Sequence, residues 1–267
     1  MNVKFFLATA GFLTATVAAI APAQAFTTFT FNTNYSPKPA DPKKDIKLES
    51  VSFNGNTVTQ FNLVNRAQIL VNSMTVSSPG QAGPGSSDHG DGTVSDATLP
   101  EGPAVENPTN ADVVASLGNL NLNSIIDTED NLGTSSFNVF FDKPVNTFFL
   151  FERGDSFGKP GNSDLLVQAI DASGNLTGQT FKITRNLWTD AGYSIDTTEI
   201  GGPQRVGSYG IQSKTAIAGL RLSSYIGFNG PDYKVVAAHV PEPSALMGLG
   251  VASGSFFLLR RRKSVKA

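Results

Sequence analysis

Short runs of apolar and aromatic residues alternate with polar and turn-forming residues through most of the chain. Phe137, Val139 and Phe141 are separated by single residues, which places them on one face of a strand. Positions 148–151 are apolar without interruption, which predicts a strand buried on both faces. Similar patterns predict strands at 26–31, 46–53, 57–64, 165–171, 176–184, 193–200, 206–211, 216–223 and 233–238.

Turn-forming residues separate these predicted strands. Asn54-Gly55 lies between two of them and predicts a β-hairpin, and positions 172–175 predict a second one. Positions 142–145 predict a turn before the run at 148–151. Roughly ten or more short strands with such turns predict an all-β fold, a β-sandwich or jelly roll, as one domain over 26–238.

Positions 77–108 break the strand pattern. The segment is rich in Pro, Gly, Ser and Asp and poor in apolar residues, so it predicts a long flexible loop. A short helix is expected over 111–117, begun by Thr109 or Asn110 and ended by Gly118.

The C-terminal region has a different pattern. Positions 244–259 carry no charge over 16 residues, and Arg260, Arg261, Arg262 and Lys263 follow. A helix of that length is roughly 24 Å long, at the short end of what spans a bilayer core of about 30 Å. The basic cluster would keep its end in the cytoplasm, with the body on the other side of the membrane. The alternative is an ordinary buried C-terminal helix.

The N-terminal 25 residues have the layout of a secretory signal peptide. Lys4 precedes an apolar run over 5–20, and Ala23 and Ala25 form an A-x-A site for signal peptidase. We therefore expect 1–25 to be removed and the mature chain to begin at Phe26. A second membrane anchor is the alternative.

The residues just before the apolar segment carry a resemblance. Val240 is followed by Pro241-Glu242-Pro243, then by the apolar helix and the arginine cluster. This arrangement over 240–267 resembles the PEP-CTERM sorting signal of bacterial exosortase substrates. The resemblance implies that exosortase, a membrane protease, recognises the Pro-Glu-Pro motif and removes the helix and basic tail.

Parts of the body also resemble a group of cyanobacterial exosortase-dependent surface proteins. The segments that carry this likeness are 126–130, 151–154, 162–171 and 230–235. The resemblance implies a place at the cell surface and contributes no activity.

Composition excludes several kinds of chemistry. The chain has no cysteine and two histidines, so disulfides, thiolate catalysis and cysteine zinc sites are excluded. Without both terminal signals, 14 Lys and Arg remain against 21 Asp and Glu, a net charge of −7. An acidic body argues against nucleic acid as a partner and is compatible with divalent cations.

Two groups of carboxylates are candidate calcium ligands. Asp88 and Asp91 lie in a Gly-rich stretch, and Asp127, Glu129 and Asp130 form a second group. Calcium takes oxygen ligands from loops of this kind, although the downstream Glu of an EF-hand is missing. The alternative is that these are solvated turn carboxylates, with no cofactor bound.

Other candidate sites have stronger competing interpretations. Trp188 and Tyr193 could form a sugar-stacking platform or pack in the core. Arg153 is expected to pair with Asp164 or Glu152. The stretch 154–158 matches G-x-S-x-G, but the Pro and Gly that follow prevent the helix that a nucleophile elbow requires.

These observations predict a secreted, exosortase-processed protein of the cell surface or extracellular matrix with a non-enzymatic role and no catalytic residues. Its partners would be signal peptidase, exosortase, the membrane before processing, and an exopolysaccharide. A carbohydrate- or calcium-binding module is the first alternative. An extracellular hydrolase is the second.

Overall fold

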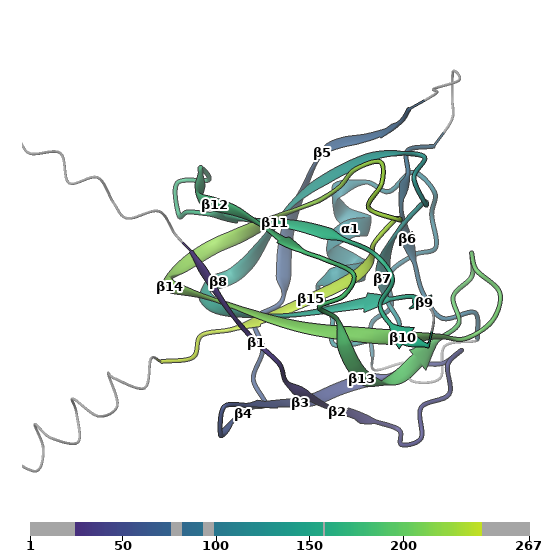
Figure 1. Cartoon of the computed structure of the whole chain (residues 1–267), viewed down its shortest axis with the longest axis horizontal. Coiled ribbons are helices and arrows are strands. Elements are labelled where there is room, and N and C mark those ends of the chain that lie inside the picture. The colour runs from purple at the N-terminus through teal and green to yellow at the C-terminus, as the bar shows by residue number, and fades with distance from the viewer. Residues whose placement is uncertain (1–24, 76–81, 93–98, 157, 242–267) are drawn as a thin grey trace, which may run out of the picture.

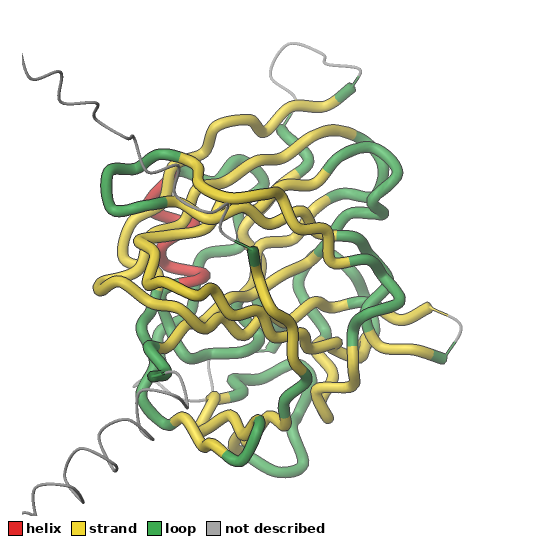
Figure 2. The backbone as a smooth tube through the Cα atoms, turned by 60° about the vertical axis from the view of Figure 1, so that its left-hand side comes forward, coloured by secondary structure: helices red, strands yellow, loops and turns green. Residues whose placement is uncertain are grey.

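The computed structural model describes residues 25–75, 82–92, 99–156 and 158–241, and their backbone is mostly strand (Figures 1 and 2). The predicted all-β class is therefore confirmed. The elements in chain order are β1 (Phe26–Phe29), β2 (Asn32–Ser36), β3 (Lys47–Phe53), β4 (Asn56–Val58), β5 (Val64–Met74), β6 (Gly85–Asp88), α1 (Asn110–Leu117), β7 (Ile125–Thr128), β8 (Gly133–Arg153), β9 (Asp155–Ser156), β10 (Lys159–Pro160), β11 (Leu165–Ile170), β12 (Leu176–Ile183), β13 (Thr189–Ile195), β14 (Gln204–Ser224) and β15 (Asp232–Ala238).

Two long antiparallel strands, β8 and β14, organise the large sheet. Each has 21 residues, and they pair with each other along their length. The outer edge of β8 pairs first with β5 and then with β15. The outer edge of β14 pairs in turn with β13, β1 and β11. The two long strands therefore form the centre of this sheet, and β12, β7 and β6 extend it through β11 and β15.

The ribbon of β8 and β14 bends where its register shifts. Gln212 is opposite Thr147 and Ile217 is opposite Val145, so β14 has extra residues at this point. Residues 142–144 of β8 are exposed there. A turn had been predicted at 142–145, but the chain stays in β8 because paired shifts in both strands absorb the bend.

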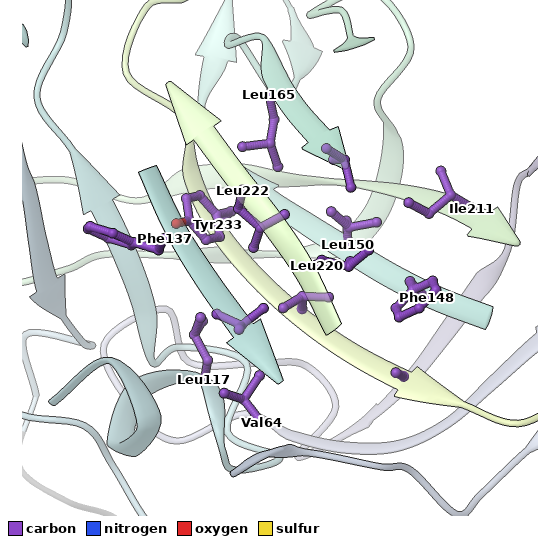
Figure 3. Close-up of a cluster of buried hydrophobic side chains, with 14 of the residues drawn as sticks. Val64, Leu117, Phe137, Phe148, Leu150, Leu165, Ile211, Leu220, Leu222 and Tyr233 are labelled. Carbon is purple, nitrogen blue, oxygen red and sulfur yellow. The ribbon is translucent and has the colours of Figure 1, made fainter. Parts of the chain in front are cut away.

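Both faces of the sheet are buried around the second half of β8. Phe148 and Leu150 point into one hydrophobic cluster, which the close-up in Figure 3 shows. Phe149 and Phe151 point into a second cluster on the opposite face. All four are at most 2 % exposed, which confirms the prediction of a strand buried on both faces.

A small sheet of β2, β3 and β4 lies beside the large sheet (Figure 1), and its side chains complete the second cluster. The predicted hairpin is present: Phe53 pairs with Asn56, and Asn54 and Gly55 both have positive φ, at 46° and 76°. The ring of Phe149 lies 5.2 Å from Phe31 and 5.5 Å from Phe53, centre to centre. Aromatic packing thus joins the small sheet to the large one.

The segment 77–108 contains a strand that the sequence did not reveal. Gly85–Asp88 forms β6, pairs with β7 and is buried at all four positions. Asn72 fixes its start, because the amide of Asn72 bonds both backbone groups of Gly85, at 2.7 and 2.8 Å. The prediction of one long loop was wrong because hydrogen bonds, not apolar side chains, hold this strand.

The predicted short helix is present as α1, and Thr109 begins it. The hydroxyl of Thr109 accepts from the backbone N–H of Asp112, and the Asp112 carboxylate accepts from the N–H of Thr109. This reciprocal capping box satisfies two backbone donors at the helix start.

The signal peptide and the sorting signal were predicted at the two ends of the chain, and most of their residues lie outside the described ranges. These are the signal peptide with Ala23, the residues Glu242 and Pro243, the helix at 244–259, and Arg260, Arg261, Arg262 and Lys263. Within the described part of the chain, no helix reaches the length and apolarity needed to cross a membrane.

Replacing Phe149 by alanine should strongly destabilise the fold, because the ring is fully buried and is packed among other aromatic rings. We expect a loss of about 3–5 kcal/mol in the free energy of unfolding, measured by urea titration. Leu176→Ala, at a position 39 % exposed, is the control and should change it by about 0.5 kcal/mol or less. Equal losses in the two variants would contradict the assigned core.

Candidate functional site

The register of four adjacent strands places one charged row across the large sheet. Arg153 in β8 is opposite Asp232 in β15. The pairing of β15 with β7 sets Asp232 beside Asp127, and Asp127 is opposite Ser86 in β6. Neighbours in register point to the same face, so these side chains meet although they come from distant parts of the chain.

Arg153 is the centre of this row and is 1 % exposed. Its Nη2 lies 2.5 Å from Asp127 Oδ2 and 2.6 Å from Asp232 Oδ2. Its Nε donates to the same Asp232 oxygen at 3.1 Å, and its Nη1 donates to the hydroxyl of Thr197. A buried guanidinium needs such partners, because an unpaired charge in the interior is strongly unfavourable.

Asp88 lies next to this row and is fully buried. Its Oδ1 accepts from the Thr198 hydroxyl at 2.5 Å and from the Thr198 backbone N–H at 3.2 Å. The same oxygen accepts from the backbone N–H of His89 at 2.8 Å. Asp88 therefore fixes the segment around Thr198 against the edge of β6.

That segment brings Glu199 to the same place. Glu199 Oε1 accepts from the hydroxyl of Ser86 at 2.6 Å. Carboxylate oxygens of Asp88, Asp127 and Glu199 all lie within 4.8 Å of one another. We call these three residues, with Asp232 and Arg153, the acidic cluster. It sets four carboxyl groups against one guanidinium.

Burial and mutual repulsion shift the acidities in the acidic cluster. Burial, with the nearby carboxylates of Asp127 and Asp88, raises the pKa of Glu199 to about 7. Burial also raises the pKa of Asp127 and, further, that of Asp232, although Arg153 opposes both shifts. Burial works against the charge of Arg153, but Asp232 and Asp127 outweigh it and raise its pKa. The acidic cluster therefore tends to hold a proton, and its arginine stays charged.

A pocket of about 360 Å³ lies beside the acidic cluster, and Glu199 is the residue of the cluster that lines it. Glu199 and Thr198 form one part of its lining, and Glu106 and Glu129 contribute further carboxylates. Oxygen ligands around such a space are what a divalent cation prefers. Glu199, with Asp88 and Asp127 behind it, could hold a cation there.

The structure separates the five candidate calcium ligands. Asp88 and Asp127 come from the two predicted groups and meet in the acidic cluster. Glu129 lies at the pocket wall, whereas Asp130 is exposed and takes no part in the acidic cluster. Asp91 is exposed and forms an ion pair with Lys43 at 2.7 Å, as expected of a solvated turn carboxylate.

The expected partners of Arg153 were wrong. Asp164 instead pairs with Lys182 at 2.7 Å and with Arg185 at 3.2 Å. Glu152 is adjacent to Arg153 in β8, so the two side chains point to opposite faces of the sheet. Glu152 Oε2 accepts from the backbone N–H of Asn162 at 3.0 Å. Burial raises the pKa of Glu152 well above its usual value.

Sequence reasoning missed Glu199 and Asp232. Asp232 and Lys234 alternate with Tyr233 and Val235 in a short strand, and polar residues at alternate positions are ordinarily read as the solvent face. Here the second face of β15 is buried too. Glu199 was placed in the strand predicted at 193–200, but β13 ends at Ile195 and Glu199 lies in a bend that follows it.

Among the described residues, Lys234 is the second buried cation after Arg153. The hydrogen bonds of its Nζ go to carbonyl and amide oxygens, not to a carboxylate. That atom donates to Ser116 O at 2.7 Å, Asn119 Oδ1 at 3.0 Å and Ser124 O at 3.0 Å. Three acceptors match the three N–H bonds of an ammonium group. Burial lowers the pKa of Lys234 well below its usual value, so this cage has to offset the loss of water.

The two candidate sugar-stacking residues are in the core. Trp188 is 6 % exposed and Tyr193 is 5 % exposed. Trp188 Nε1 donates to Ser163 O at 2.8 Å, and its ring packs edge-on against Tyr209. Core packing, the alternative interpretation, is what the structure shows for both, because neither ring has an open face for a sugar.

The G-x-S-x-G match is also settled by the local structure. Asp155–Ser156 forms β9, and it pairs with Lys159–Pro160 in β10 as a short hairpin. A nucleophile elbow needs a helix after the serine. The expectation that no helix starts here is confirmed.

No known protein-family model matches the chain, and no curated protein is significantly similar to it. Among solved structures, the enzymatically active domain of tailspike protein 4 of bacteriophage CBA120 is similar over 42 % of this chain, at 10 % identity and a TM-score of 0.23. The matched part spans 15 % of that tailspike chain. At this TM-score the likeness carries no conclusion about fold or function.

Glu199 should make stability fall as pH rises. An acid with a higher pKa in the folded protein binds more protons when folded, so its contribution is fully present below about pH 4.5 and is lost as pH rises through about 7. Glu199→Gln should remove this pH-dependent contribution to stability, because Gln keeps the acceptor for Ser86 and has no charge. We expect the variant to gain about 1 kcal/mol over the wild type between pH 4.5 and pH 8, after allowance for solvent screening.

Urea titrations at both pH values measure this difference. Glu106→Gln is the control, because Glu106 lines the same pocket and is exposed. Parallel pH profiles for wild type and Glu199→Gln would show that Glu199 ionises normally.

Proposed function

We propose that this chain is an exported protein of the cell surface or extracellular matrix, with a non-enzymatic role. In this proposal, 26–238 is a β-sandwich surface domain, signal peptidase removes 1–25, and exosortase cuts at Pro241-Glu242-Pro243. The apolar segment 244–259 would hold the precursor in the membrane until that cut. An exopolysaccharide of the envelope is the partner that this location suggests.

The observation that carries the proposal is where the first and last strands of the described residues lie relative to the two expected cuts. The first strand starts at Phe26, directly after the expected signal-peptidase site at Ala25. Phe26 pairs with Ser213, and its ring packs edge-on against Phe148 and Phe181. A mature chain that begins at Phe26 would therefore keep its first residue in the fold.

The other boundary lies at the sorting motif. The last strand, β15, ends at Ala238, and Pro241 is exposed. A cut at or after Pro241 would remove no strand and no core residue of the described domain. The described strands and core residues thus lie between the two expected cuts, which is compatible with export and trimming.

The charged groups of the domain support a structural role. The guanidinium of Arg153 donates hydrogen bonds to Asp127, Asp232 and Thr197, and the carboxylate of Asp88 accepts from backbone and hydroxyl donors. Such fully bonded side chains stabilise a loop and a sheet edge, and they have little freedom to act on a substrate. The hydrolase hypothesis would need two carboxyl groups opposed across the pocket at about 5–9.5 Å. It stays a hypothesis, with Glu129 and Glu199 as the pocket residues to test.

Mass spectrometry of the extracellular protein from its native host tests the processing. We expect an N-terminus at Phe26 and a C-terminus at or shortly after Pro241. The double variant Pro241→Ala, Pro243→Ala should keep its C-terminal tail and stay with the membrane fraction, because the motif is lost. Pro203→Ala, at an exposed proline elsewhere, should be processed normally. Extracellular wild-type protein that still ends at Ala267 would refute the proposal.

Calcium binding is the second candidate function, and the close approach of Asp88, Asp127 and Glu199 is the observation that favours it. Four buried or half-buried carboxyl groups exceed the charge of one arginine, and a bound cation would balance them. Arg153 already neutralises part of that charge, and a proton on Glu199 could neutralise more. Calcium and protons are therefore competing occupants of the acidic cluster.

A thermal and chemical unfolding comparison at pH 8 separates these two possibilities. About 10 mM calcium should stabilise the wild type by about 1–3 kcal/mol if it binds with the affinity of an extracellular module. Glu199→Gln should lose most of that gain. Asp91→Asn, which changes an exposed carboxylate outside the acidic cluster, should keep it. No difference between calcium and EDTA in the wild type would exclude calcium binding.

A further inference from the structure

One side-chain contact holds the backbone in place beyond the end of β15. The backbone ladder of β15 ends with Ala238 opposite Thr147 of β8. Two residues later, the amide of Asn146 bonds both backbone groups of Val240. Val240 N donates to Asn146 Oδ1 at 2.9 Å, and Asn146 Nδ2 donates to Val240 O at 2.8 Å.

The side chain that makes this contact is buried in the domain. Asn146 is 4 % exposed, and its Oδ1 also accepts from the Thr147 hydroxyl at 3.0 Å. The side chain of Val240 packs against the second hydrophobic cluster. Asn146 lies at the register shift of β8, and the ladder of β8 with β15 ends one residue away at Thr147, so the amide of Asn146 takes the place of a backbone partner for Val240.

Pro241, the next residue, differs from Val240. Pro241 has no backbone N–H to donate and is exposed. Ala238, His239 and Val240 form one side of a surface groove of about 700 Å³, with Lys143 and Pro144 on its lining. A protease can therefore approach residues 238–240. To cut there, it must bind an extended segment that is no longer bonded to the domain. Val240 does not meet that condition while Asn146 holds it.

We propose that Asn146 is a positioning residue that holds Val240 against the domain and so confines processing to the chain that follows Val240. The processing step rests on the proposed function, while the hold on Val240 can be tested without it. The amide of asparagine is required, because it offers one donor and one acceptor at the correct spacing. Aspartate offers only acceptors, and alanine offers neither.

Hydrogen exchange of the full-length protein tests the hold directly. In Asn146→Ala, the Val240 amide should exchange roughly 5- to 30-fold faster than in the wild type, because its acceptor is lost. In the near-isosteric Asn146→Asp, the amide should exchange at an intermediate rate, since one of the two bonds remains. This second variant guards against a folding defect in the first.

Asn138→Ala is the matched control. Asn138 is a 5 % exposed asparagine of the same strand, and it bonds Arg221 and Gln68 instead. It should leave the Val240 amide protected as in the wild type. Equal exchange of this amide in wild type, Asn146→Ala and Asn146→Asp would overturn the inference.

The mature C-terminus of the same variants, from the native host, tests the consequence. The wild type and Asn138→Ala should each give one C-terminus at or after Pro241, and Asn146→Ala should give additional termini upstream of it. An unchanged single terminus in Asn146→Ala would overturn the role in processing. If the wild type itself ends at Ala267, the processing proposal fails, and the exchange rates alone still decide whether Asn146 holds Val240.

Discussion

The pairing of β8 with β14 is the constraint on which the rest of the structure depends. Because these two strands are in register for most of their length, β1, β5, β11, β13 and β15 take their places along the outer edges of the pair, and β12, β7 and β6 are added through β11 and β15. The bend in the ribbon turns its two halves, so that one cluster of hydrophobic side chains is enclosed between them. The opposite face of the second half is closed by the small sheet.

The same register creates the electrostatic problem that the domain has to solve. A sheet buried on both faces leaves no solvent side for Arg153, Asp232 and Lys234. Arg153 is balanced by carboxylates from two neighbouring strands, and Lys234 is enclosed by oxygen atoms at the end of α1 and in the loop that follows. The carboxyl groups around Arg153 outnumber its single positive charge. Burial and the repulsion among them raise the pKa of Glu199, which lies at the pocket. Ligand chemistry, if the domain has any, is expected at this point.

Several features could be predicted from sequence because they depend on local pattern. The apolar run at 148–151, the Asn54-Gly55 hairpin and the capped helix after Thr109 all have causes within a few residues. The strand β6 could not be predicted this way, because its Ser and Asp side chains are stabilised by partners up to 113 residues away. The bend at 142–144 was read as a turn, since its cause is a shift in the pairing with β14.

The sequence by itself determined the strand-rich class of the domain, because period, turn chemistry and uninterrupted apolar runs are visible in the order of residues. Only the tertiary structure decided which charges meet. Asp88, Asp127, Glu199 and Asp232 lie far apart in the chain and come together through strand register, which depends on long-range pairing and leaves no mark on any short segment. For the same reason, only the fold shows that Asn146 holds Val240 at the point where the chain leaves the domain.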